Sequence, residues 1–187
     1  CGYGEILKHS LINNKNFFNF LNKNFHNITS LKSPFIEKAI YESCKIKKKI
    51  VEKDEKEKNL RKVLNFGHTF AHAYEATLGY TKKLNHGEAV ILGIQSALKF
   101  AFTNKIIKSK EYELIINHFK QSNLPMNLKD YFSSKDYNRI LSFMLNDKKN
   151  KSKKINLILL KKIGFPIIDK EFSQNILKVF LKKELSN

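Results

Sequence analysis

The stretch EAVILGIQSALKFAF, residues 88–102, constrains the fold more than any other part of the sequence, because it is apolar on nearly every side of a helix. Such a helix must be surrounded by other elements, so we expect it at the centre of the core. Helical spacing of apolar residues recurs along most of the 187-residue chain, and only three prolines and seven glycines interrupt it. The sequence therefore predicts a mostly α, multi-helix domain.

Two segments before the central helix are also predicted to be helical. Residues 3–22 should form one or two helices with four buried side chains, Phe17, Phe18, Phe20 and Leu21. A longer helix begins after Ser33-Pro34, covers residues 35–55, and carries an apolar stripe of Ile36, Ile40, Cys44 and Val51. Lys47 falls on that stripe, where it either extends outward along its stem or points into a site that requires positive charge. Position alone favours the first interpretation.

The remainder of the chain predicts further helices and one β-hairpin. A charged connection, residues 53–61, leads to a helix over residues 67–78, which the loop 79–85 joins to the central helix. Two more helices are expected from Ser109 to Ser122 and from Ser134 to Leu145. The segments KINLILL and FPIIDK, joined through Ile163-Gly164, predict a small β-hairpin, and a last helix follows near Phe172 to Leu185.

The charge balance raises the possibility of a nucleic-acid partner. The chain has 35 basic and 17 acidic residues, a formal net charge of +18, and such a surplus attracts anions. However, arginine occurs only at Arg61 and Arg139, and the lysines are scattered between apolar positions along the whole chain. Solvated faces are therefore the favoured interpretation, and a basic helical nucleic-acid-binding module is the alternative.

Two further observations concern location. No uncharged apolar run approaches the roughly 18 residues that a membrane-spanning helix needs, and Cys1 and Cys44 have no metal or redox spacing. Two cysteines in a chain of this length indicate a reducing compartment. We expect a soluble, cytoplasmic protein that does not bind a membrane.

The histidines of NFGHTFAHAYE, residues 65–75, are the strongest candidates for chemistry. On a helix, His68, His72 and Glu75 share one face, and His86 follows where a loop meets the start of the central helix. A catalytic zinc commonly takes three protein ligands and leaves one position open. Three histidines and a carboxylate are one ligand more than such a site needs. The residues alone therefore leave three alternatives open: all of them bind one metal, some bind the metal while others act in catalysis, or they only pack in the core.

Several blocks of the sequence, in order, resemble one enzyme family. LNFGHTFAHAYE is preceded by DEKEKNLR and followed by LNHGEAV, with GEILKH at residues 4–9 and MLNDKKN at residues 144–150. Together these blocks are similar to the metal-binding C-terminal domain of the 3-dehydroquinate synthase family of sugar-phosphate cyclases. They extend over most of the chain. His9 departs from the tyrosine that often follows the lysine in the family's first block.

The resemblance assigns roles to individual residues. It implies that Glu5, His68 and His86 hold a zinc ion, with cobalt as the alternative metal, and that His72, Lys8 and Glu57 act in catalysis. It places five further side chains at substrate-contacting positions: Lys47, Arg61, Asn65 and the pair Lys148 and Lys149. Taken in isolation, Lys8 and Glu57 would be interpreted as solvated surface charges. Glu75 and Glu88 are expected to be structural or to fix histidine tautomers.

The resemblance also implies what the chain lacks. Residues 1–187 would be the C-terminal helical domain, the start at Cys1 a cut inside a longer protein, and the NAD-binding N-terminal domain absent. None of the seven glycines forms a dinucleotide-binding loop. The expected partners are that domain, a phosphorylated sugar acid and a second subunit in a homodimer.

The activity that the resemblance implies belongs to the shikimate pathway. The whole enzyme would convert 3-deoxy-D-arabino-heptulosonate 7-phosphate to 3-dehydroquinate and phosphate, with NAD and the metal as cofactors, and the isolated fragment would be inactive. Related sugar-phosphate cyclases and polyol dehydrogenases of the same fold are the alternatives within the enzymes. Lys8, Lys47 and Arg61 favour a phosphorylated acid over a neutral polyol.

Overall fold

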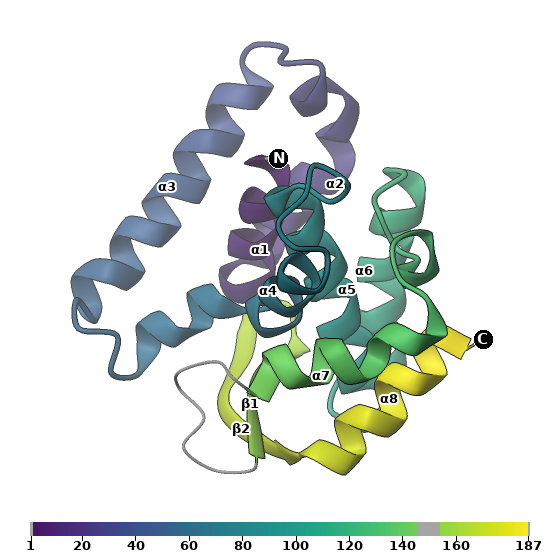
Figure 1. Ribbon diagram of the computed structural model, residues 1–187. Helices are drawn as coiled ribbons and strands as arrows, with labels where there is room; N and C mark the ends of the chain where they lie inside the picture. Colours follow the sequence, from purple (N-terminus) through teal and green to yellow (C-terminus); the bar gives the residue numbers. More distant parts are fainter. Residues whose placement is uncertain (1, 146–153, 187) are drawn as a thin grey trace.

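The computed structural model describes residues 2–145 and 154–186 and is mostly helical (Figure 1). Its α-helices are α1 (Gly2–Asn13), α2 (Lys15–Thr29), α3 (Phe35–Lys53), α4 (His68–Thr77), α5 (His86–Thr103), α6 (Ser109–Gln121), α7 (Tyr137–Leu145) and α8 (Gln174–Ser186). Short 3-10 turns, η1 (Leu60–Asn65), η2 (Leu128–Asp130) and η3 (Ser134–Asp136), connect some of them. One antiparallel hairpin, β1 (Lys154–Lys162) and β2 (Phe165–Ser173), precedes α8. The predicted fold class, mostly α with a small hairpin near the C-terminus, is confirmed.

Helix α5 is the centre of the core, as its composition predicts. Every residue from Ala89 to Ala101 is buried except Lys99, which pairs with Glu184 of α8 at 2.7 Å. Helices α1, α4 and α6 and strand β1 all pack against α5. Its first turn is fixed by a capping box, in which Asn85 accepts from the backbone N–H of Glu88 and Glu88 accepts from that of Asn85. The start of α5 is therefore a fixed point of the fold.

Two glycine contacts bring α1 and α4 unusually close to α5. A Cβ added to Gly93 would overlap the carbonyl oxygen of Gly67, and one added to Gly4 would lie 2.6 Å from the carbonyl oxygen of Gly87. Gly67 also has a φ of +80°, a left-handed conformation that side chains rarely adopt. These contacts place the first turn of α1 beside the first turn of α5, and the start of α4 beside the middle of α5.

The prediction for α3 is correct in extent but wrong in orientation. Its buried residues are Ala39, Ser43, Ile46 and Ile50, each one position before a member of the predicted stripe, whereas Ile40, Cys44 and Lys47 are exposed. The reason is tertiary packing, because α3 packs against α1, α2 and η1. Ala39 and Ser43 are small, and the Ser43 hydroxyl is 2.7 Å from Nδ1 of the buried His9 in α1. A polar contact therefore lies on the buried face, and apolar periodicity cannot indicate it.

Smaller differences occur at both ends of the chain. Phe17, Phe18 and Leu21 are buried as expected, but Phe20 is only half-buried, with the Lys38 ammonium 4.7 Å from its ring centre. Strand β2 continues through Ser173, so α8 begins at Gln174 rather than near Phe172. Among the described residues, no helix combines the length and apolar character that crossing a membrane requires.

Candidate metal and substrate site

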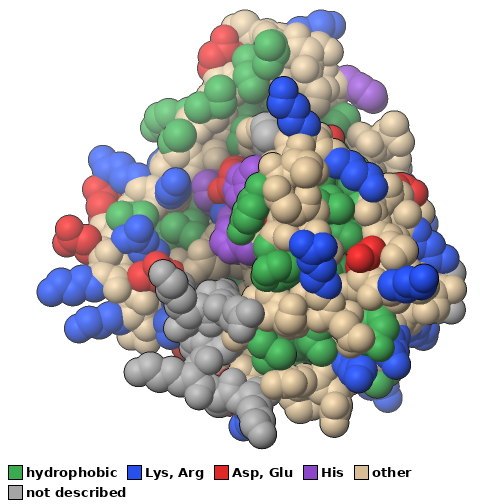
Figure 2. All heavy atoms as spheres, viewed as in Figure 1, with side chains coloured by type: hydrophobic (Ala, Val, Ile, Leu, Met, Phe, Trp, Pro, Cys, Tyr) green, Lys and Arg blue, Asp and Glu red, His purple; other side chains and the backbone are tan. Residues whose placement is uncertain are grey.

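Three side chains with metal-binding atoms meet where α1, α4 and α5 converge. Glu5 lies in the first turn of α1, and His68 and His86 are the first residues of α4 and α5. One ligand atom from each of the three lies within 4.8 Å of the others, and Glu5 Oε1 is 3.4 Å from His68 Nε2. Figure 2 shows histidine side chains gathered with a carboxylate in a hollow near the centre of this face.

The protonation of these groups suits a divalent cation. Burial opposes ionisation of Glu5, but the Lys8 ammonium and His68 outweigh it and lower the pKa of the carboxyl. Burial and the nearby Lys8 charge lower the pKa of His68 to about 4, so its imidazole is neutral at pH 7. Glu5 Oε1 is buried and has no hydrogen-bond partner among the described residues. An ionised carboxylate and a neutral imidazole are donors that zinc prefers.

The third histidine is oriented by a carboxylate. His86 Nδ1 lies 3.0 Å from Glu75 Oε1, and because a carboxylate can only accept, Nδ1 carries the proton. This contact leaves Nε2 of His86 as the ring nitrogen that can face a metal. This contact agrees with the expectation that Glu75 fixes a histidine tautomer, whereas Glu88 caps α5.

His72 stands beside this group rather than in it. Its ring centre is 5.3 Å from that of His68 and 6.5 Å from that of His86, and its side chain is exposed. Among the residues that the structure describes, the cluster within metal-binding distance contains Glu5, His68 and His86 without His72.

Lys8 is not a surface charge, so that interpretation of its isolated position is wrong. It is 3% exposed and donates to Glu5 Oε2 at 2.7 Å. Burial lowers the pKa of its ammonium, Glu5 opposes this shift, and the nearby Lys47 charge adds to it. Lys47 itself is exposed, on a side of α3 close enough for its charge to act on Lys8 and His9.

The remaining candidates follow α3. Asn65 Nδ2 donates to Glu57 Oε1 at 2.7 Å, and Arg61 Nη1 donates to the carbonyl oxygen of Glu55 at 2.6 Å. Sequence reasoning missed Asp54, whose carboxylate accepts three backbone N–H groups of the same segment. The sequence indicates this role only through the position of Asp54, an aspartate directly after a predicted helix and before a polar run, where its side chain can accept from nearby backbone N–H groups. Lys148 and Lys149 lie outside the described residues.

Comparison with known proteins identifies the family. The family model described as 3-dehydroquinate synthase C-terminal matches residues 2–150. The chain belongs to this family. A 3-dehydroquinate synthase of Pelagibacter ubique is 61% identical over 186 residues, which are 100% of this chain and 50% of the relative. One from Thermoanaerobacter sp. is 38% identical over 178 residues, 95% of this chain and 49% of the relative.

The chain spans about half the length of these 3-dehydroquinate synthases. Solved structures share the fold. A Streptomyces hygroscopicus 2-epi-5-epi-valiolone synthase with NAD+ and Zn2+ bound has a TM-score of 0.82 at 17% identity, over 98% of this chain and 50% of that one. A 2-deoxy-scyllo-inosose synthase complexed with carbaglucose-6-phosphate, NAD+ and Co2+ has a TM-score of 0.78 at 21% identity. The match covers 97% of this chain and 50% of that one. The family model and the relatives thus confirm the resemblance to the 3-dehydroquinate synthase family.

Proposed function

We propose that this chain supplies the metal- and substrate-binding part of a 3-dehydroquinate synthase. Together with an N-terminal NAD-binding domain, it would convert 3-deoxy-D-arabino-heptulosonate 7-phosphate to 3-dehydroquinate and phosphate. The convergence of Glu5, His68 and His86 beside the buried Lys8 carries this proposal. The protein would act in the cytoplasm as a homodimer. The nucleic-acid alternative is not favoured, because the family match covers residues 2–150.

The metal would be held by Glu5, His68 and His86. Zinc or cobalt would supply a Lewis acid for substrate oxygens, and NAD+ on the other domain would supply the redox chemistry. Glu75 keeps the proton of His86 on Nδ1, so that Nε2 can face the metal. Lys8 holds the Glu5 carboxylate at 2.7 Å and keeps it ionised.

The other side chains would bind and orient the substrate. Lys47 and Arg61 provide positive charge for a carboxylate or phosphate, and the Arg61 guanidinium can bind either one in a bidentate manner. His72 is exposed beside the metal-binding histidines, where it can hold or transfer a proton. Glu57 and Asn65 form a hydrogen-bonded pair that can orient hydroxyl groups. Lys148 or Lys149 remains a predicted contact.

A turnover assay on the full-length protein tests this proposal. With NAD+ and zinc, we expect 3-deoxy-D-arabino-heptulosonate 7-phosphate to yield equal amounts of phosphate and 3-dehydroquinate, without net reduction of NAD+. Residues 1–187 alone serve as a control that should be inactive. Net reduction of NAD+ by a neutral polyol, without phosphate release, would instead support a polyol dehydrogenase. Turnover of glucose 6-phosphate alone would support a related cyclase.

The Arg61→Lys variant tests the anion-binding role. The substitution keeps the charge but loses the planar pair of donors, so kcat/KM should fall about 10- to 100-fold, or roughly 1.4–2.7 kcal/mol. Zinc content should not change, because Arg61 touches none of the proposed ligands. Arg139→Lys on α7 is the matched control, since Arg139 is exposed, lies over the Phe143 ring and has no proposed role in the site. Unchanged kinetics in Arg61→Lys would remove Arg61 from the substrate site.

A further inference from the structure

The side chain of Asp54 organises the segment between α3 and η1. Asp54 is the first residue after α3, and its two carboxylate oxygens accept three backbone N–H groups. Oδ1 accepts from Lys58 at 2.9 Å, while Oδ2 accepts from Asn59 at 2.8 Å and from Arg61 at 3.0 Å. These bonds lower the pKa of the Asp54 carboxyl, so the charged acceptor is present at neutral pH. One side chain therefore fixes the main chain on both sides of a tight turn.

The segment requires such an acceptor for two reasons. Asn59, which precedes η1, makes no side-chain capping bond, and the N–H of Arg61 in the first turn of η1 is accepted by Asp54 instead. Glu57 has a φ of +52°, a left-handed conformation that is costly for a residue with a side chain. Its N–H donates to the Asp54 carbonyl oxygen at 3.2 Å, and the Asp54 side chain holds the next N–H, that of Lys58. Asp54 thus stabilises the strained residue from both sides.

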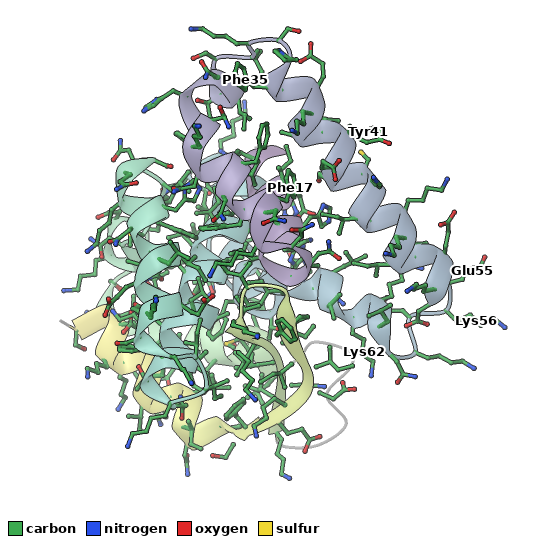
Figure 3. The ribbon with its side chains drawn as sticks, turned by 180° about the vertical axis from the view of Figure 1, so that it is seen from behind. Phe17, Phe35, Tyr41, Glu55, Lys56 and Lys62 are labelled. Atoms are coloured by element: carbon green, nitrogen blue, oxygen red, sulfur yellow. The ribbon has the colours of Figure 1, made fainter. Side chains whose placement is uncertain are left out.

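The residues that this turn carries are the proposed substrate contacts. Glu57 Oε1 accepts from Asn65 Nδ2 at 2.7 Å, and Arg61 Nη1 reaches back to the Glu55 carbonyl oxygen at 2.6 Å. Figure 3 shows Glu55 at one end of α3 and Phe35 at the other. Glu55, Lys56 and Lys58 in the turn are exposed, and Asp54 is only half-buried. Removing its carboxylate should therefore alter the turn and leave the core intact.

We infer that Asp54 is a positioning residue of the substrate site, which sets Glu57 and Arg61 through their main chain and touches no reacting atom. This inference rests on the proposed function. It differs from a general stabilising role, because it predicts a defect in substrate binding without loss of metal. It also predicts that the effect passes through Arg61 and Glu57.

Two variants of Asp54 in the full-length protein test the inference. Asp54→Ala removes all three acceptor contacts, so KM should rise and kcat/KM should fall about tenfold or more, with zinc content unchanged. Asp54→Asn keeps one oxygen that can still accept from Asn59 and Arg61, so it should recover part of the loss. The matched control is Asp136→Ala. Asp136 Oδ2 accepts from Ser133 N at 2.7 Å and from Ser133 Oγ at 2.9 Å, in a turn that carries none of the proposed site residues. This variant should keep wild-type kcat/KM.

Two further readouts separate positioning from other causes. In an Arg61→Ala background, Asp54→Ala should lower kcat/KM by a smaller factor than it does in the wild type. The reason is that the Arg61 side chain, one of the groups that Asp54 positions, is already absent. Hydrogen exchange should show loss of protection at the amides of Lys58, Asn59 and Arg61 in Asp54→Ala. The exchange measurement does not depend on turnover. If the wild type had no synthase activity, the proposed function would be contradicted, but hydrogen exchange would still test whether Asp54 holds the turn. Unchanged protection of these amides, or an undiminished effect in the Arg61→Ala background, would overturn the inference.

Discussion

Gly93→Ala is expected to destabilise the protein by about 3 kcal/mol, although alanine is the better helix former. In the middle of an exposed helix the same change would stabilise by about 1 kcal/mol. Here the new Cβ would overlap the carbonyl oxygen of Gly67 and lie 2.9 Å from the backbone nitrogen of Ala71. These two atoms are joined by the first hydrogen bond of α4, at 3.0 Å, so they cannot rotate away as a side chain would. The steric cost should therefore exceed the gain in helix propensity.

The measurement is unfolding of the full-length variant, followed by circular dichroism in denaturant. Gly2→Ala is the matched control, because Gly2 also lies in a helix but no atom comes within 4 Å of an added Cβ. We expect Gly2→Ala to be neutral or slightly stabilising. Gly93→Ala should also bind metal more weakly, since pushing α4 from α5 moves His68. Wild-type stability in Gly93→Ala would mean that α4 and α5 separate without cost.

The central helix and the hairpin could be predicted from the sequence because each depends on a local pattern. Residues 88–102 are apolar on all sides, and α5 is surrounded on all sides. The close approach at Gly93 could not be predicted in this way. A glycine within a helical pattern indicates a possible contact, but its partner, Gly67, is identified only by the packing of α4 on α5. Tertiary packing decides where helical stripes meet.

The orientation of α3 and the environment of Lys8 show the same limit. Apolar periodicity selected Ile36, Ile40, Cys44 and Val51, whereas burial follows the small residues and the Ser43 hydroxyl that face α1. A lysine on a short helix is usually solvated, and Lys8 is buried because Glu5, three residues before it, offers an ion pair at 2.7 Å. The contact of Ser43 with His9 joins residues far apart in the sequence, and neither polar contact follows from the spacing of apolar residues.

The metal ligands of the candidate site could be predicted only in part from the residues themselves. The spacing of His68, His72 and Glu75 on one helix could not distinguish metal ligands from neighbours, and only the family resemblance favoured Glu5, which lies more than 60 positions away. In the structure, Glu5 reaches His68 because α1 and α4 both pack against α5. A chelate built from separate elements depends on the fold. The division of roles between the two histidines of α4 is therefore best tested by experiment.

His68→Ala and His86→Ala are each expected to purify without zinc and without activity, whereas His72→Ala should keep its zinc. The first two variants remove one of three proposed protein ligands, which weakens the whole site. His72→Ala removes an exposed imidazole beside the ligands, so it should retain near-stoichiometric metal and lose activity by about 10²- to 10⁴-fold, the usual contribution of a proton-transfer group. Metal analysis of the three purified full-length variants, paired with the turnover assay, gives the comparison.

The three variants also control for one another. His68 and His72 are one turn apart on α4 and their ring centres are 5.3 Å apart, so a general disturbance of the helix should affect both variants alike. The two ring environments differ, however: His68 is largely buried against Glu5, and His72 is exposed. If His72→Ala loses zinc as fully as His68→Ala while circular dichroism shows a folded protein, the two histidines of α4 form the chelate. The proposed division of roles would then be wrong, because His72 would be a metal ligand rather than a group that faces substrate.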